Sequence, residues 1–98
     1  MATFIMLTNF TEEGIKGVKA KGKDRKAAVE KLVGDFGGEI KSSYLTMGRY
    51  DRVMVLDFPD DETMAKFALS FGALGLARTN TLRAFVDDEV IAIVQGIL

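Results

Sequence analysis

The sequence predicts an α+β domain of the ferredoxin-like class, in which helices cover one face of a four-stranded antiparallel sheet. Two observations support this prediction. Strand-like and helix-like segments follow one another in the order β-α-β-β-α-β, and one extra helix closes the chain. The chain has 98 residues, a length typical of one domain, so we expect residues 1–98 to fold as a single unit.

The first third of the chain predicts a strand and then a helix. The strand covers residues 2–9, where apolar side chains occupy both faces. Thr11 is expected to be the helix N-cap, because two glutamates stand in the turn that follows it. Apolar residues then recur at helical spacing but falter near Gly22, so we expect two helical pieces or one kinked helix. The glycine pair at 37–38 is expected to end it.

Two strands joined by a turn are predicted in the middle of the chain. Residues 39–47 form the first strand, residues 48–51 the turn, and residues 53–58 the second strand. This second strand is apolar on both faces, which is typical of a central strand, and Pro59 ends it.

Acidic runs at residues 60–62 and 87–89 each open a segment with helical apolar spacing. Because carboxylates at a helix start satisfy free N–H groups, we expect both runs to cap helices rather than to hold a metal ion. The first of these helices is expected to end at Gly72 and Gly75. Between the two helices, residues 78–86 alternate polar and apolar side chains and predict the fourth strand.

The central strands of this topology carry more apolar surface than the helices can cover. In the first strand either Phe4 and Met6 or Ile5 and Leu7 would pack under the helices, and the other pair would face water. An apolar sheet face of this kind needs a cover. The C-terminal helix could cover part of it, whereas a second subunit could cover all of it. We therefore expect a homodimer or a higher even oligomer.

Composition excludes several classes of site. The chain has a net charge of −1 and contains neither cysteine nor histidine. Disulfides, thiolate nucleophiles, serine–histidine–aspartate triads and histidine-ligated metals are therefore excluded, and we expect no metal and no cofactor. No apolar run is long enough to cross a membrane, and no targeting signal opens the chain. We expect a cytoplasmic protein without a membrane partner.

Basic residues are concentrated in the first half of the chain. Residues 1–49 carry nine basic and six acidic side chains, against four and eight in residues 50–98. Most of the excess lies in residues 16–26, which could form either a nucleic-acid patch or a solvated helix face. Because no aromatic residues for base stacking are interleaved with it, we favour the solvated face and expect no nucleic-acid partner.

Chain direction predicts where a ligand site would lie. The loop after the first strand, the hairpin between the second and third strands, and the approach to the fourth strand all meet at one end of the sheet. A mouth there would present Tyr44, Arg49, Tyr50, Asp51 and Arg78 to a small anionic or aromatic ligand. In this interpretation Arg49 or Arg78 holds a carboxylate or phosphate. Asp51 is a hydrogen-bond acceptor or general base, and Tyr50 is an acid or a stacking wall.

The same residues also have a purely structural interpretation, which we favour. Gly48 supplies the positive φ of the hairpin turn, Asp51 pairs with a neighbouring arginine, and Tyr50 packs across a dimer interface. Both interpretations stay open on the sequence alone.

Several segments of the chain together resemble a known family. Residues 44–51 read Tyr-Leu-Thr-Met-Gly-Arg-Tyr-Asp, and the opening residues 3–10 and the later stretches 71–75, 78–79 and 81–85 add to the likeness. On these residues the chain resembles the GYD domain family over nearly its whole length. In this sequence Arg49 separates Gly48 from Tyr50, so the motif stands as Gly-x-Tyr-Asp. The resemblance implies a small bacterial protein of the dimeric α+β barrel superfamily, which pairs ferredoxin-like sheets face to face, and it implies no particular reaction.

Three functions are compatible with these features. The leading hypothesis is an oligomeric protein that binds or senses a small molecule at the mouth. The alternatives are a cofactor-independent enzyme that uses Tyr50 and Asp51 for proton transfer, and a structural assembly module in which the motif only holds the hairpin and the dimer interface. The superfamily analogy alone does not choose among them.

Overall fold

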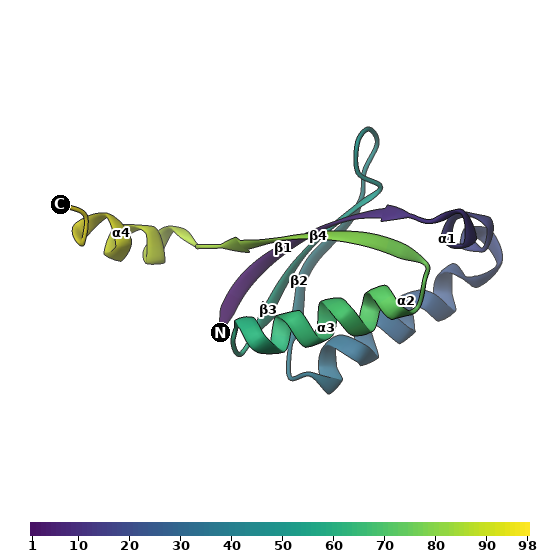
Figure 1. The fold of residues 1–98 in the computed structure, drawn as a ribbon, viewed down its shortest axis with the longest axis horizontal. Coiled ribbons are helices and arrows are strands. Elements are labelled where there is room, and N and C mark those ends of the chain that lie inside the picture. The colour runs from purple at the N-terminus through teal and green to yellow at the C-terminus, as the bar shows by residue number, and fades with distance from the viewer.

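A computed structural model describes all 98 residues and shows one four-stranded antiparallel sheet in the order β2-β3-β1-β4, with helices on one face (Figure 1). The predicted ferredoxin-like fold class is confirmed. The elements are β1 (Ala2–Phe10), α1 (Glu12–Lys16), α2 (Val18–Asp35), β2 (Glu39–Leu45), β3 (Arg52–Phe58), α3 (Asp61–Ala73), β4 (Ala77–Ala84) and α4 (Asp87–Gln95). Strands β2 and β4 each end two residues earlier than the sequence predicts.

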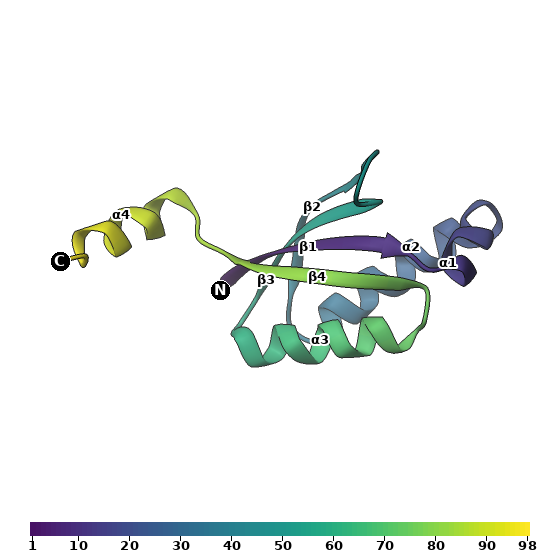
Figure 2. The ribbon, with the colours of Figure 1, turned by 45° about the horizontal axis from the view of Figure 1, so that its top comes forward.

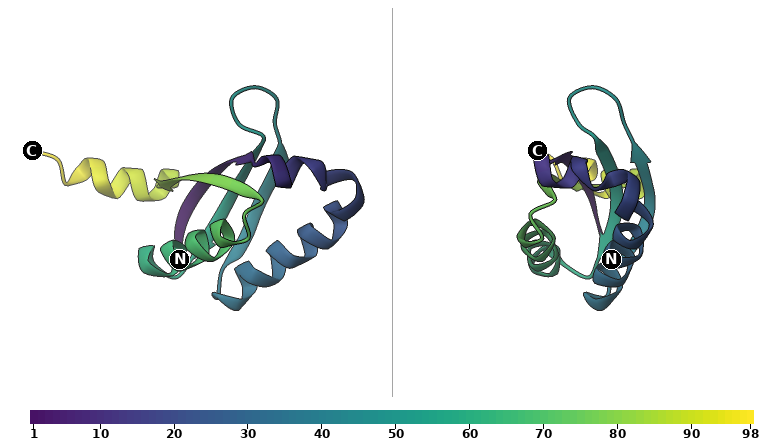
Figure 3. Two further views of the ribbon diagram at one scale, coloured as in Figure 1. Left: turned by 45° about the vertical axis from the view of Figure 1, so that its right-hand side comes forward. Right: turned by 90° about the vertical axis from the view of Figure 1, so that its right-hand side faces the viewer.

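One face of the sheet is buried under α2 and α3 (Figure 3). Alternation along β1 and β3 directs Phe4 and Met6 toward this covered face, which decides the choice that the sequence left open. Phe58 of β3 packs on Phe67 of α3 with ring centroids 5.2 Å apart. The buried core consists of Phe4, Met6, Val33, Met54, Leu56, Phe58, Met64 and Phe67.

The helical segment after β1 breaks at Gly17 rather than near Gly22. Thr11 caps α1 as predicted, accepting a hydrogen bond from the N–H of Gly14. Gly17 is both the C-cap of α1 and the N-cap of α2, and a β-carbon there would make the flexible Arg25 side chain shift. Gly22 has no neighbour within 4 Å of such a β-carbon and continues α2 without interruption. The predicted break is therefore wrong in position, because a single glycine such as Gly22 lowers helix propensity without ending the helix.

The two later helices begin differently. Asp60 caps α3 and accepts a hydrogen bond from the N–H of Thr63, as predicted. The N-cap of α4 is Val86, whose N–H donates to the carboxylate of Glu89 at 3.2 Å. The expectation that the run 87–89 supplies the N-cap residue is therefore wrong, because the cap is one residue earlier and all three acidic residues lie in the first turn. None of the helices combines the length and apolarity needed to cross a bilayer.

Helix α4 projects beyond the end of the sheet and gives the molecule its elongated shape of 52 × 30 × 19 Å (Figures 1 and 2). No residue of α4 is buried. The possibility that this helix covers the outer side of the sheet is therefore wrong within one chain, since the helix leads away from it. We call residues 85–98 the C-terminal arm.

The second face of the sheet carries no helix. Its apolar side chains come from β1, β3 and β4, where paired residues such as Ile5 and Val55 lie side by side. Leu82, opposite Ile5 on β4, is 47% exposed. We call this surface the outer face and define it by Ile5, Leu7, Val53, Val55 and Leu82.

Candidate functional site

Three connections converge at one end of the sheet, as chain direction predicts. The N–H of Thr11, after β1, donates to the carbonyl of Leu76 at 3.1 Å, and its hydroxyl donates to the carbonyl of Gly75 at 2.7 Å. The β2–β3 hairpin joins the same end, since the N–H of Asp51 donates to the carbonyl of Thr8 at 2.8 Å. Hydrogen bonds therefore tie the α3–β4 loop and the hairpin to the end of β1.

Asp51 fixes the hairpin to the sheet. Its carboxylate accepts a hydrogen bond from the backbone N–H of Phe10 at 2.9 Å, and its carbonyl accepts one from the N–H of Thr46 at 2.8 Å. The structural interpretation is therefore right about anchoring but wrong about the partner, because Asp51 forms no ion pair with an arginine. Phe10 lies beyond Thr8, the last residue of β1 that pairs with β3, so its N–H needs another acceptor, and this carboxylate supplies it.

The tip of the hairpin holds the remaining residues of the motif. Gly48 has a φ of +112°, a conformation that side chains with a β-carbon disfavour, which confirms the turn predicted there. The Arg49 guanidinium lies 5.8 Å from the centre of the Tyr50 ring. The hydroxyl of Thr46 donates to the carbonyl of Tyr50 at 2.6 Å and closes the base of the turn.

Tyr44 and Arg78 lie on opposite edges of the sheet. Tyr44 is on β2 opposite Val53, and Arg78 is on β4 opposite Asn9. The strand order places β3 and β1 between them, a separation of about 14 Å at the usual spacing of strands. The structure thus groups Arg49, Tyr50 and Asp51 in one hairpin but does not bring Tyr44 and Arg78 to a common point.

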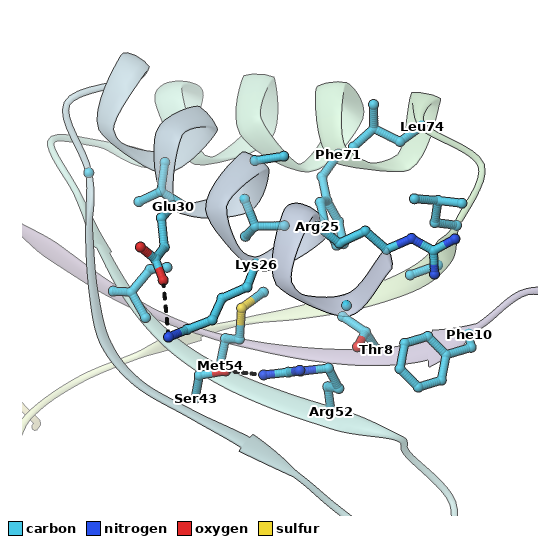
Figure 4. A pocket seen from close by; sticks show the side chains of 18 of the residues that line it. Thr8, Phe10, Arg25, Lys26, Glu30, Ser43, Arg52, Met54, Phe71 and Leu74 are labelled. Carbon is cyan, nitrogen blue, oxygen red and sulfur yellow. Dashed lines mark hydrogen bonds and ion pairs between the residues drawn. The ribbon is translucent and has the colours of Figure 1, made fainter. Parts of the chain in front are cut away.

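A cavity of about 760 Å³ opens between α2 and the covered face of the sheet and extends from the converging loops to the start of β2 (Figure 4). The end of β1 contributes Thr8 and Phe10, and the α3–β4 connection contributes Leu74 and Leu76. None of the five residues that the sequence suggested lines it. The apolar part of the lining includes Val29, Val33, Ile40, Met54 and Phe71.

Three basic side chains border this cavity. Lys26 of α2 pairs with Glu30 at 3.5 Å, and Arg25 donates to the carbonyl of Gly14 at 2.6 Å. Arg52 of β3 donates to the hydroxyl of Ser43 at 2.6 Å. In Figure 4, Lys26 and Arg52 extend toward the same side of the cavity.

The sequence pattern does not reveal these cavity residues. Arg25 and Lys26 belong to the basic run 16–26, which as a pattern resembles a solvated helix face. Arg52 stands at the start of a strand, where nothing in the sequence indicates that α2 leaves space above it. The feature of the sequence that could have indicated the cavity is Arg52, a charged residue next to an otherwise apolar strand segment.

Comparisons with known proteins agree with the geometry of the fold. A family model described as "GYD domain" matches residues 4–94. The chain is 32% identical over 92 residues to the "Glutamine synthetase and cystathionine beta-lyase binding protein" of Thermus thermophilus, covering 94% of this chain and 97% of the relative. A solved structure titled "crystal structure of FFRP-DM1" is similar with a TM-score of 0.58 and 22% identity, covering 87% of this chain and 100% of that one.

Proposed function

Because the chain belongs to the GYD domain family, we propose that it is a self-associating module that binds another protein. The observation that carries this proposal is the pair of uncovered apolar surfaces, the outer face and the C-terminal arm. Monomers in water rarely keep contiguous apolar surfaces of this kind, and such surfaces mark interaction sites.

The arm has the pattern of a helix that packs against something. At about 100° per residue, its exposed aliphatic side chains fall within roughly half of the helix circumference. These side chains are Val90, Ile91, Ile93 and Val94, and Ile97 and Leu98 follow the end of the helix; all six are at least 40% exposed. No other part of the chain covers this stripe, so its partner must come from a second molecule.

The outer face and the arm suit a second copy of the chain. Four strands and seven residues give the outer face dimensions on the order of 19 by 23 Å, roughly 440 Å². A stable interface buries about 800 Å² on each partner. The outer face alone is therefore too small for a stable interface. The arm, whose helix is about 13.5 Å long, is the element that can reach a neighbouring subunit and add the missing buried area. We propose a two-fold pair in which outer faces stack and each arm lies on the other subunit.

The second part of the proposal concerns the partner protein. The relative from Thermus thermophilus is named for binding glutamine synthetase and cystathionine beta-lyase, and it matches this chain almost end to end. We propose that the assembled protein binds an enzyme of one of these two kinds from its own cell.

Sedimentation equilibrium tests the self-association. The wild type is expected to have an even multiple of the 10.7 kDa chain mass, and Val55→Lys is expected to be a folded monomer because it places a charge in the outer face. Leu69→Lys is the matched control, since Leu69 is 77% exposed on α3, away from the outer face. A monomeric wild type, or equal masses for all three proteins, would contradict the proposal.

Biolayer interferometry with the two purified enzymes from the same organism tests the partner. Saturable binding of either enzyme to the wild type supports the proposal, and failure of both enzymes to bind overturns this part of it. Repeating the measurement with Val55→Lys shows whether the assembled form is the one that binds.

The enzyme alternative and the hairpin ligand site stay predictions. In the enzyme alternative, Tyr50 and Asp51 transfer protons, but the Asp51 carboxylate already accepts the Phe10 N–H, which favours an anchoring role. If the hairpin were catalytic, Tyr50→Phe would lower turnover while leaving ligand binding largely intact.

A further inference from the structure

The cavity under α2 combines an apolar interior with basic groups at its border. Its volume of about 760 Å³ lies within the range of pockets that hold small molecules. Thr8 on its floor is 2% exposed, so the floor is well removed from bulk water. Such a cavity favours a molecule with an apolar body and a polar end.

The charged side chains around the cavity differ in whether they already have an ion-pair or hydrogen-bond partner within the chain. Lys26 is paired with Glu30, and Glu39, also at the border, is paired with Lys41 at 3.7 Å. Arg25 is engaged with the carbonyl of Gly14. Arg52 has no carboxylate within 4 Å and donates only to the Ser43 hydroxyl. Since a guanidinium has five N–H donors, Arg52 keeps most of its donors free.

We propose that this cavity binds a small monocarboxylate with an aliphatic or aromatic body, and that Arg52 is the residue that binds the carboxylate. The planar guanidinium matches the two oxygens of a carboxylate. The ligand body lies among Val29, Val33, Met54 and Phe71. The Ser43 hydroxyl holds Arg52 in place through its 2.6 Å hydrogen bond.

Charge favours a carboxylate over a phosphate. The lining contains three basic and two acidic side chains, an excess of one positive charge that a singly charged ligand neutralises. A phosphate monoester with two negative charges would leave an uncompensated charge in a partly dry site. The cavity opens on the helix side of the sheet, so this inference is independent of the proposed pairing through the outer face.

Isothermal titration calorimetry with octanoate tests the proposal, with octanol and octyl phosphate as comparison probes that have the same number of carbon atoms. Octanoate is expected to bind with one site per chain and more tightly than either comparison probe. Arg52→Gln is expected to weaken octanoate binding about tenfold or more, because a charge-assisted hydrogen bond is lost. Arg52→Lys keeps the charge but not the bidentate geometry. Its affinity for octanoate is expected to lie between those of the wild type and Arg52→Gln.

Lys66→Gln is the matched control, because Lys66 lies on α3, pairs with Glu62 at 3.6 Å and does not border the cavity. It is expected to bind octanoate like the wild type. Val55→Lys is expected to do the same even as a monomer, which separates failure of this inference from failure of self-association. The inference is overturned if octanoate shows no saturable binding, if Arg52→Gln binds as the wild type does, or if octyl phosphate binds more tightly than octanoate.

Discussion

The two faces of the sheet are built from the same strands and from similar residues, yet helices cover one face and leave the other uncovered. On the covered face, Met6 and Leu56 are completely buried beneath the helices. On the outer face, Leu7 and Val55 occupy the adjacent positions of the same strands and remain half-buried. The difference shows that the chain contains more apolar surface than its own helices cover, which is the basis of the proposed pairing.

The comparison also separates two kinds of contribution to stability. Side chains on the covered face stabilise the single chain, since they are buried wherever the chain is folded. In the proposed pairing, side chains on the outer face stabilise the assembly, so their effect depends on protein concentration.

Truncating a core side chain is expected to give the largest effect. Phe67 of α3 is fully buried against Phe58, so Phe67→Ala should lower the free energy of unfolding by about 3–5 kcal/mol. Val53→Ala on the outer face should cost less than about 1.5 kcal/mol in dilute protein, where assembly contributes little. Urea unfolding at low concentration measures both. Equal losses would show that the two faces do not differ as described.

A smaller loss is expected where the hairpin is tied to the sheet. Asp51→Ala leaves the N–H of Phe10 without its acceptor, so it should cost about 1–3 kcal/mol. Arg49→Ala, which removes only a tip residue of the same hairpin, should be nearly neutral. Urea unfolding compares the two variants, and an Asp51→Ala protein as stable as the wild type would contradict the anchoring role.

Two glycines should respond with opposite signs. Gly48 has a φ of +112°, so Gly48→Ala should destabilise the chain by about 1–2 kcal/mol. Gly72 lies inside α3 with open space around it, so Gly72→Ala should stabilise the chain by about 0.5–1 kcal/mol. Thermal unfolding followed by circular dichroism checks both signs. A neutral Gly48→Ala would mean that the turn conformation is not required.

The smallest effect is expected at the cap of α3. The hydroxyl and the backbone N–H of Thr63 donate to Asp60 and hold the pKa of its carboxyl below the usual 3.8. A carboxyl with a lowered pKa stabilises the fold above its unfolded pKa, and this contribution is lost as pH falls through the folded pKa. Melting temperatures of wild type and Asp60→Ala should therefore differ at pH 7 and still at about pH 4, and converge only as the pH falls further, through the folded pKa below 3.8. A difference that persists in strong acid would contradict this explanation.

The sequence predicts the elements of this fold well because each has a local signal. Alternating apolar residues identify the strands, Thr11 and Asp60 identify two helix starts, and the order of elements identifies the topology. The sequence does not predict which face of β1 is covered, because both faces are apolar. The break at Gly17 is not predicted either, since the interrupted apolar pattern indicates Gly22, which α2 passes without interruption.

The candidate site was predicted only in part. Convergence of three loops follows from strand direction alone and is confirmed by the hydrogen bonds of Thr11 and Asp51. The cavity is set by how far α2 lies from the sheet, which is a property of tertiary packing. For the same reason, periodicity predicts an amphipathic helix at the C-terminus but not its direction away from the sheet.

Pulsed dipolar EPR tests the stacking of outer faces most directly. The chain has no cysteine, so Asn80→Cys on the outer side of β4 and Leu69→Cys on α3 each provide one site for a spin label. Stacked sheets lie about 10 Å apart, so Asn80 labels on two subunits should be clearly closer than Leu69 labels, which the helix layers separate further. Absence of any dipolar coupling, or Leu69 labels closer together than Asn80 labels, would contradict the proposed pairing.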